Sequence, residues 1–490
     1  MMQSLSHENG KESAITLIGV APESKNMSRL SDQLDAQAFL PDHASLLAAC
    51  NNSSKPIVMV LPAHKPWLIL KAARHPNVLR LVVFYTHQSS PSRIKQALTR
   101  AAFALVDQTI VWSIDEITSA VRSGADPDRI ISAQQTNIVA HILDEQPRRA
   151  QSEAAASFGL DVAEMTGTIR LLEKLSPDKG VNVINYHRIL PPDEHRRYTR
   201  PQQALASPIF EIQLEEFANR DGFVDLENVR DRSAEGSTGI TFDDGYEDNF
   251  RVALPALKKW SVPAWIFVVT GQVGNANSLW WDYIGDALFA LWEQKSAELE
   301  HPSLPIQCGE LLKTRSTLQA RRLISEILTE LNATNEHTRK DVSDVLRKLS
   351  GHSEQSTMLS WEQVKEMHAS GIQFGSHTRN HVCLDELSSK TAKEEVRSGQ
   401  EDLEKVLGDR AKKSVALPRG KLGPFTEETL REEGFESVMT TIAGVNRSSD
   451  KSLFVLRRDG KMLTLRGRHH PAKMRLELSG WLDRARQLLR

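Results

Sequence analysis

The stretch GITFDDG at residues 239–245 places two adjacent carboxylates directly after an apolar strand. Adjacent carboxylates such as Asp243 and Asp244 raise each other's pKa. The energetic cost of keeping both ionised falls when a metal ion neutralises one of them. The pair therefore indicates cation binding or proton transfer at the end of a strand. The alternative interpretation is a solvated turn, because Asp-Gly is also a common turn dipeptide.

A second polar cluster, HTRNH at residues 377–381, directly follows the apolar segment IQFGS. His377 and His381 are four residues apart, so both imidazoles reach one ion if the chain turns helically after the strand. The chain contains 16 histidines, so one HxxxH pattern is weak support on its own. Each histidine is equally compatible with ordinary hydrogen bonding in the core or at the surface.

Taken together, the two clusters make a stronger argument, because each ends an apolar strand. In open α/β sheets, ligands gather at the carboxyl ends of the strands. One carboxylate and two imidazoles leave coordination positions open, which is typical of a catalytic rather than a structural zinc site. The remaining carboxylate is then free to act as a base.

Composition sets broad limits on the fold and function of the chain. Its 490 residues predict two to four domains at about 150 residues each. The 61 basic and 63 acidic residues lack the basic excess of a general nucleic-acid binder. Cys50, Cys308 and Cys383 lie too far apart for a CxxC metal pair. The polar N-terminus and the absence of an apolar run of ~18 residues favour a cytoplasmic protein without a transmembrane segment.

The alternation of strands and helices predicts an α/β protein with two main domains. After a polar tail (1–13), residues 14–142 read as a doubly wound parallel sheet domain, and residues 143–180 as a helical linker. A second α/β domain spans 181–490 and is interrupted by a helical insertion at about 281–357. The candidate strands are 14–21, 56–63, 79–85, 109–113, 129–133, 181–187, 239–242, 264–270, 372–377 and 414–418.

The second domain resembles a known family. The segments ITFDDGYEDNF (240–250), GSHTRNH (375–381) and ALPRG (416–420) are similar to the first three motifs of the NodB-type polysaccharide deacetylases, carbohydrate esterase family 4. The resemblance covers about 181–460 in the expected order. It implies an irregular (β/α) barrel, usually with seven strands.

The resemblance also implies roles for the polar residues of both clusters. Asp243 would be the general base, and Asp244, His377 and His381 would hold one divalent metal ion. Zinc is favoured because the site offers nitrogen and oxygen ligands with imidazole prominent, while cobalt, nickel, iron and manganese also fit.

One departure from the family concerns an arginine. Many members carry an arginine two residues before the proline of the third motif, where it orients the base. Here that position is Ala416. Arg419, Arg457 and Arg458 are candidate replacements, and the sequence does not choose among them.

The other departure concerns the catalytic acid, because the family's C-terminal histidine motif is not recognisable. The segment VNVINYHRI (181–189) resembles the opening strand of circularly permuted family members, which predicts His187 as the acid. The alternative is a strand-end histidine that packs locally. His469 and His470 are next in line, although RGRHHPAK reads as a solvated loop.

The N-terminal domain is similar to another fold over a short stretch. Residues 104–133 weakly resemble the end of the first Rossmann-like domain of GT-B glycosyltransferases. Without a glycine-rich phosphate loop or a second nucleotide-sugar domain, a binding, docking or degenerate module is favoured over an active transferase.

The sequence as a whole predicts a hydrolase that removes N-acetyl groups from an amino sugar. Its location, in the cytoplasm or at the inner membrane face, favours a lipid-linked or nucleotide-linked precursor, with partners in glycan biosynthesis contacted through the N-terminal domain. Trp280 and Trp281 are either sugar-stacking platforms or packing anchors. The alternatives are hydrolysis of another amide or an O-acetyl ester, and a non-catalytic carbohydrate-binding or scaffold protein.

Overall fold

The computed structural model describes residues 151–488, apart from 177–178, 276–277, 315 and 351–356, together with separate segments between residues 16 and 132. The predicted polar tail and the start of the predicted linker lie outside the described residues. The chain divides into two compact units, each continuous in space but not in sequence. The first unit comprises 1–171, 315–319 and 464–473, and the second comprises 172–314, 320–463 and 474–490.

In the segments of the first unit that the structure describes, six strands form a sheet in the order β2-β1-β3-β4-β5-β6, and all the strand pairs seen there are parallel. Parallel neighbours require crossover connections, and α4 and α5 lie in two of them. The bounds of the elements are β1 Thr16–Val20, β2 Phe39–Leu40, β3 Ile57–Pro62, β4 Val78–Phe84, α4 Arg93–Phe103, β5 Gln108–Val111, α5 Ile114–Arg122, β6 Ile130–Ser132 and α7 Gln151–Met165.

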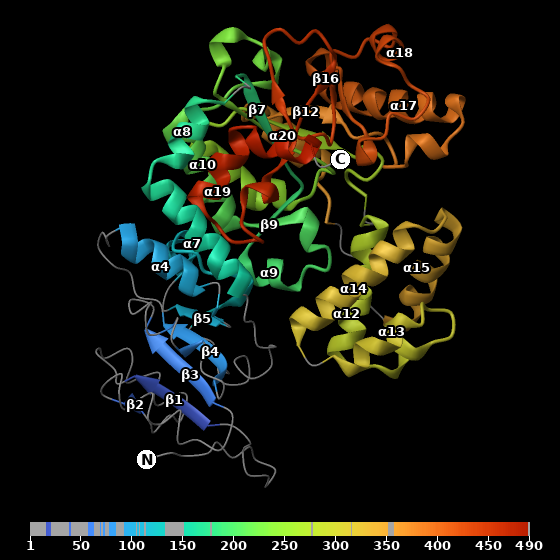
Figure 1. The fold of residues 1–490 in the computed structure, drawn as a ribbon. Helices are drawn as coiled ribbons and strands as arrows, with labels where there is room; N and C mark the ends of the chain where they lie inside the picture. Colours follow the sequence, from blue (N-terminus) through green and yellow to red (C-terminus); the bar gives the residue numbers. More distant parts are fainter. Residues whose placement is uncertain are drawn as a thin grey trace. The chain divides into compact units, whose positions relative to one another are not determined.

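The second unit is built on a sheet that nearly closes into a barrel (Figure 1). Its order is β15-β7-β10-β11-β12-β13-β14-β16, and β17 also pairs with β7. Two residues separate β16 from β17, so the chain itself bridges the remaining opening. The bounds are β7 Val181–Tyr186, β10 Thr238–Phe242, β11 Ala264–Val268, β12 Gln373–Ser376, β13 Ser414–Ala416, β14 Ser437–Met439, β15 Val445–Asn446, β16 Phe454–Val455 and β17 Arg458–Asp459.

This sheet confirms the predicted irregular (β/α) barrel. All its strand pairs are parallel except β15 with β7. Strands β7, β10 and β11 are buried along their whole length. Their continuous apolar runs fit strands that are covered on both faces. Because β7, β10, β11 and β12 are parallel neighbours, their carboxyl ends lie along one rim of the barrel.

Four of the described helices between β11 and β12, those that precede α16 (Trp361–Ala369), form the predicted helical insertion. They pack on one another around an apolar cluster of their own, seen as the yellow helices in Figure 1. Helix α14 shows why they form, because its buried residues fall on one face of the helix. The bounds are α12 Trp280–Glu293, α13 Gln307–Glu310, α14 Thr317–Asn332 and α15 Glu336–Ser350.

The segment 464–473 is not the solvated loop that its basic sequence predicts, and that interpretation is wrong. His469 and His470 are 3% and 2% exposed. The segment belongs to the first unit, where His470 Nε2 lies 3.1 Å from the carbonyl oxygen of Ser157 in α7. Its burial depends on contacts with residues about 300 positions earlier. Among the helices of the described residues, none is long and apolar enough to cross a membrane.

Candidate active site

Three potential metal ligands meet at the carboxyl ends of β10 and β12. Asp244 follows β10, and His377 follows β12 directly. The Nε2 atoms of His377 and His381 lie 3.5 Å and 3.4 Å from Asp244 Oδ1. One potential ligand atom from each residue lies within 4.8 Å of the others. Asp244 and His381 adopt positive φ angles of 72° and 57°, a sparsely populated conformation that is common at functional sites.

The donor set fits a divalent metal ion. Asp244 is completely buried, and neither of its carboxylate oxygens has a hydrogen-bond partner among the described residues. Burial, and then the charge of Asp243, raise the pKa of Asp244 well above its usual value. A buried charge without a partner is costly, and a cation between the three residues would remove that cost.

The imidazole of His377 is held in one orientation. Its Nδ1 lies 2.7 Å from the carbonyl oxygen of Ala416 at the end of β13, so this nitrogen donates and Nε2 is left as the ligand atom facing Asp244. Burial lowers the pKa of His377 and, together with the nearby His377, lowers that of His381 well below the usual value. Both rings are therefore neutral at physiological pH, as metal ligation requires.

Asp243 lies beside the three ligands and is paired with Arg457. Nη1 and Nη2 of Arg457 donate to Oδ1 and Oδ2 of Asp243 over 2.6 Å and 2.8 Å. Asn185 Nδ2 donates to the same carboxylate over 3.0 Å. Although burial raises its pKa, the Arg457 guanidinium and His377 hold the pKa of Asp243 well below its usual value. The side chain is thus ionised and fixed in direction.

The structure therefore distinguishes among the three arginines that the sequence left open. Arg457, between β16 and β17, contacts Asp243. Arg458 faces away and pairs with Asp483 over 2.7 Å. Arg419 is exposed and donates to Asn332. Asn185, which the sequence analysis missed, also donates to Asp243; its place on β7, two residues before His187, was the available signal.

His187 lies in the bend between β7 and β8 (Arg188–Leu190) and is half-buried. Burial lowers its pKa to about 4, and the negative charge of Asp243 acts on the same ring in the opposite direction. All five residues that the sequence predicted as site residues are thus brought together at one rim of the second unit. His469 and His470 belong to the first unit.

The helical insertion contributes to this rim through the start of α12. The ring of Trp281 packs edge-on against that of His381 with centroids 5.0 Å apart. Trp281 Nε1 donates to Tyr246 Oη over 3.0 Å, and Tyr246 Oη donates to Asp282 Oδ2 over 2.9 Å. Trp281 is 5% exposed, so it acts as a packing anchor that supports a candidate ligand.

Part of the chain that carries this site is similar to a known protein family. Residues 230–438 match the family model described as polysaccharide deacetylase. The match includes all the candidate metal ligands and Asp243. Over these residues the chain is similar to the polysaccharide deacetylase (NodB) family.

Individual proteins are also similar to parts of the chain. The chain is 48% identical over 40 residues, 8% of its length, to "Putative polysaccharide deacetylase YxkH" of Bacillus subtilis (strain 168), and the match spans only 14% of that protein. Among solved structures, it is similar to IcaB from Ammonifex degensii, with 25% identity, TM-score 0.37, and 58% and 92% of the two chains covered. It is also similar to Streptococcus pyogenes deacetylase PplD in complex with acetate, with 20% identity, TM-score 0.36, and 58% and 95% covered.

Proposed function

We propose that the second unit is a metal-dependent hydrolase that removes N-acetyl groups from an amino sugar in a glycan or glycan precursor. The observation that carries this proposal is the cluster of Asp244, His377 and His381, in which a buried carboxylate lacks a partner, directly beside an ionised Asp243. The family match over the same residues supports the reaction class.

Each residue of the site has a separate role in the proposed reaction. Asp244, His377 and His381 would hold one divalent ion, with zinc the favoured metal; when bound, such an ion lowers the pKa of water and polarises the acetyl carbonyl. Asp243 accepts a proton from the attacking water. Arg457 keeps the Asp243 carboxylate ionised and aimed, since it holds both oxygens at once.

Cleavage of the carbon–nitrogen bond needs a proton for the departing amine. We assign this step to His187, because its ring shares the rim with Asp243 and its charge state responds to that carboxylate. The proton that Asp243 takes from water is thereby returned to the amine nitrogen through His187, and acetate and the free amino sugar leave. The proton count then balances without another donor.

Acetate release tests the proposal directly. Zinc-loaded protein is incubated with N-acetylated sugars and with an O-acetylated sugar, before and after chelation. We expect acetate only from N-acetyl substrates, loss of activity on chelation, and recovery with added zinc. Release from the ester alone would favour the esterase alternative. No release from any substrate, with sugar binding retained, would favour a non-catalytic carbohydrate-binding protein.

We further propose that the substrate is a lipid-linked or nucleotide-linked sugar met in the cytoplasm or at the inner membrane face. The first unit would contact partners of glycan biosynthesis. Fractionation of cells that produce the protein checks its location, and recovery of most of it outside the cell would contradict this placement.

A further inference from the structure

Arg200 lies in the connection between α9 (Pro192–Arg197) and a short 3-10 helix at Pro201–Gln203. Its guanidinium carbon stacks over the ring of Trp281, 4.6 Å from the ring centroid. The same ring also contacts the candidate ligand His381, with centroids 5.0 Å apart. Arg200 and His381 therefore contact the same indole, which places the guanidinium close to the candidate metal ligands.

The charge of Arg200 acts on the same rim. Burial dominates the pKa values of Asp244, His381 and His187, raising the first and lowering the other two. Arg200 is one of the charges that act on all three groups. A positive charge this close to the candidate metal site bears on which substrates can enter.

Unlike its neighbours, Arg200 has no anionic partner. Arg457 holds Asp243, and Arg188 Nε donates to Asp248 Oδ2 over 2.8 Å. Among the residues that the structure describes, Arg200 forms no ion pair, and its Nη1 is buried without a hydrogen-bond partner. The side chain as a whole is only half-buried, so part of it is open to solvent.

A bound metal ion would leave this charge uncompensated. Among the described residues of the rim, Asp244 is an acidic group whose oxygens lack a hydrogen-bond partner, and the metal would neutralise it. An unpaired guanidinium beside a dication is unfavourable unless an anion arrives with the substrate. Arginine suits this role because its planar fork binds phosphate and carboxylate through two parallel hydrogen bonds.

We propose that Arg200 is a specificity residue that binds an oxyanion, a phosphate or a carboxylate, carried by the substrate close to its acetamido group. This inference rests on the proposed deacetylase function and narrows its substrate class to acidic acetylated amino sugars. A neutral N-acetylglucosamine polymer would leave Arg200 unpaired.

Binding of deacetylated products tests the inference without turnover. Titration calorimetry on the full-length, zinc-loaded protein compares glucosamine 1-phosphate, muramic acid and neutral methyl glucosaminide. We expect at least one of the two anionic sugars to bind about ten-fold or more tighter than the neutral one, as expected for a charge-assisted hydrogen bond. The phosphate and carboxylate arms show which oxyanion is preferred.

Two variants and one control test whether the preference for anionic sugars depends on Arg200. Arg200→Gln should abolish it, and Arg200→Lys should retain only part of it, because lysine keeps the charge but not the fork. The matched control is Arg197→Gln. Arg197 stacks over Phe289, which lies on α12 as Trp281 does, but Arg197 is exposed and paired with Glu293. The control should keep the full preference.

The outcomes separate this inference from the proposed function. Equal binding of all three sugars by the unaltered protein, or an unchanged preference in Arg200→Gln, would overturn the role of Arg200. Acetate release from neutral substrates would then still support the deacetylase. An anion preference lost in Arg200→Gln, without acetate release from any substrate, would leave the anion site standing and overturn the function.

Discussion

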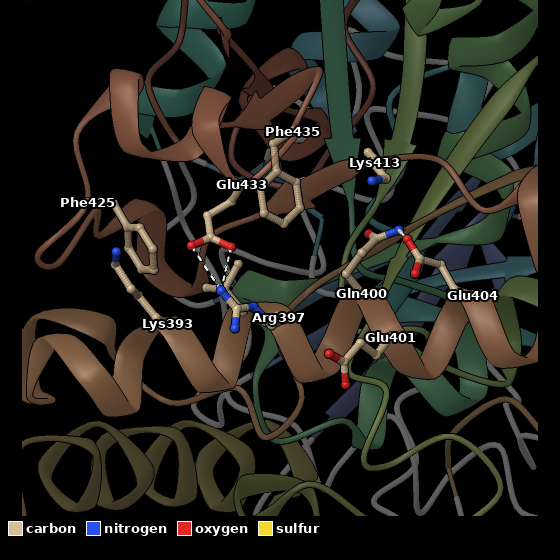
Figure 2. A pocket seen from close by; sticks show the side chains of 10 residues that line it. Lys393, Arg397, Gln400, Glu401, Glu404, Lys413, Phe425, Glu433 and Phe435 are labelled. Atoms are coloured by element: carbon tan, nitrogen blue, oxygen red, sulfur yellow. Dashed lines mark hydrogen bonds and ion pairs between the residues drawn. The ribbon is translucent and has the colours of Figure 1, made fainter.

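Two polar regions of the second unit differ in how far their charged side chains are buried and paired. One is the rim that carries Asp243 and Asp244. The other is a groove of about 170 Å³ along helix α17 (Ser389–Leu407), shown in Figure 2. Two of its charged groups, Arg397 and Glu433, pair with each other across the groove at 2.9 Å. The groove is lined by Lys393, Val396, Arg397, Gln400, Glu401, Glu404, Lys413, Phe425, Glu433 and Phe435.

The difference is one of burial and partnership. The side chain of Arg397 is 60% exposed, whereas those of Asp243 and Asp244 are 4% and 1% exposed. Exposed ion pairs contribute little to stability, and water can replace them. A buried carboxylate without a partner is costly, and the fold retains it only where an ion or substrate is expected. A hollow lined with charges is therefore a weaker indication of function than a buried charge without a partner.

The largest effects should follow substitution of the two aspartates, which the rim presents in different roles. Asp243→Asn should lower turnover by about 100-fold or more while metal content stays near one ion per chain, because only the base is lost. Asp244→Asn should lose the metal, since it removes the anionic ligand. Metal analysis and acetate release on the same preparations check both expectations.

Histidine variants extend this test. Replacing both His377 and His381 with alanine should remove metal and activity together. His337→Ala is the matched control, because His337 is a highly exposed histidine on α15. Full metal retention in the double variant would refute the ligand assignment, and equal metal loss in both aspartate variants would refute separate roles for Asp243 and Asp244.

Arg457→Gln should have the next largest effect. We expect turnover to fall by about 10- to 100-fold with KM and metal content nearly unchanged, because Arg457 positions the base without touching substrate. Added guanidinium should restore part of the activity, which a purely structural role does not predict. Arg419→Gln, at an exposed position away from Asp243, should stay near normal. Loss of metal in Arg457→Gln would contradict a positioning role.

The sequence predicted the parts of the site that depend on local patterns. Asp243, Asp244 and His377 lie at the ends of predicted strands, and parallel neighbours bring such strand ends to one rim. Arg457 was only one of three candidates because β16 and β17 are two residues long and carry no such pattern. Successive side chains near a strand point to opposite faces, so Arg457 and Arg458 were indistinguishable until the pairing with β7 was known.

The errors and omissions had a different cause, namely contacts between distant parts of the chain. His469 and His470 are both buried, and His470 contacts Ser157 of α7, about 300 residues away, so their basic neighbours gave a misleading indication of solvent exposure. Asn185 was missed because an asparagine in an apolar strand has no recognisable pattern of its own. Its role follows only from the register of β7 with β10.

Asp286, a half-buried carboxylate on α12, should show a smaller effect, on stability. Burial and the nearby Asp282 raise its pKa to about 7. The folded state thus favours the neutral form, and its stabilising contribution is lost as pH rises from about 4 to about 7. Asp286→Asn should therefore stabilise the protein by about 1–2 kcal/mol above pH 7 and by little at pH 4.

Thermal unfolding at several pH values measures this gain. Asp344→Asn is the control, since Asp344 lies on the exposed side of α15 and pairs with Arg347. The control should show no gain that grows with pH. A gain for Asp286→Asn that is the same at pH 4 and pH 8 would show that its cause is packing rather than charge.

The smallest effect should come from the groove, and this substitution tests whether the groove, unlike the rim, has no part in function. Arg397→Ala removes the exposed pair with Glu433 and should change Tm by less than about 2 °C, because solvent already screens that pair. Acetate release should be unchanged, since the groove shares no residue with the rim. If Arg397→Ala instead lowered turnover or sugar binding several-fold, the groove would be a substrate-binding surface. Exposed, mutually paired charges could then no longer be taken as a sign that a hollow lacks function.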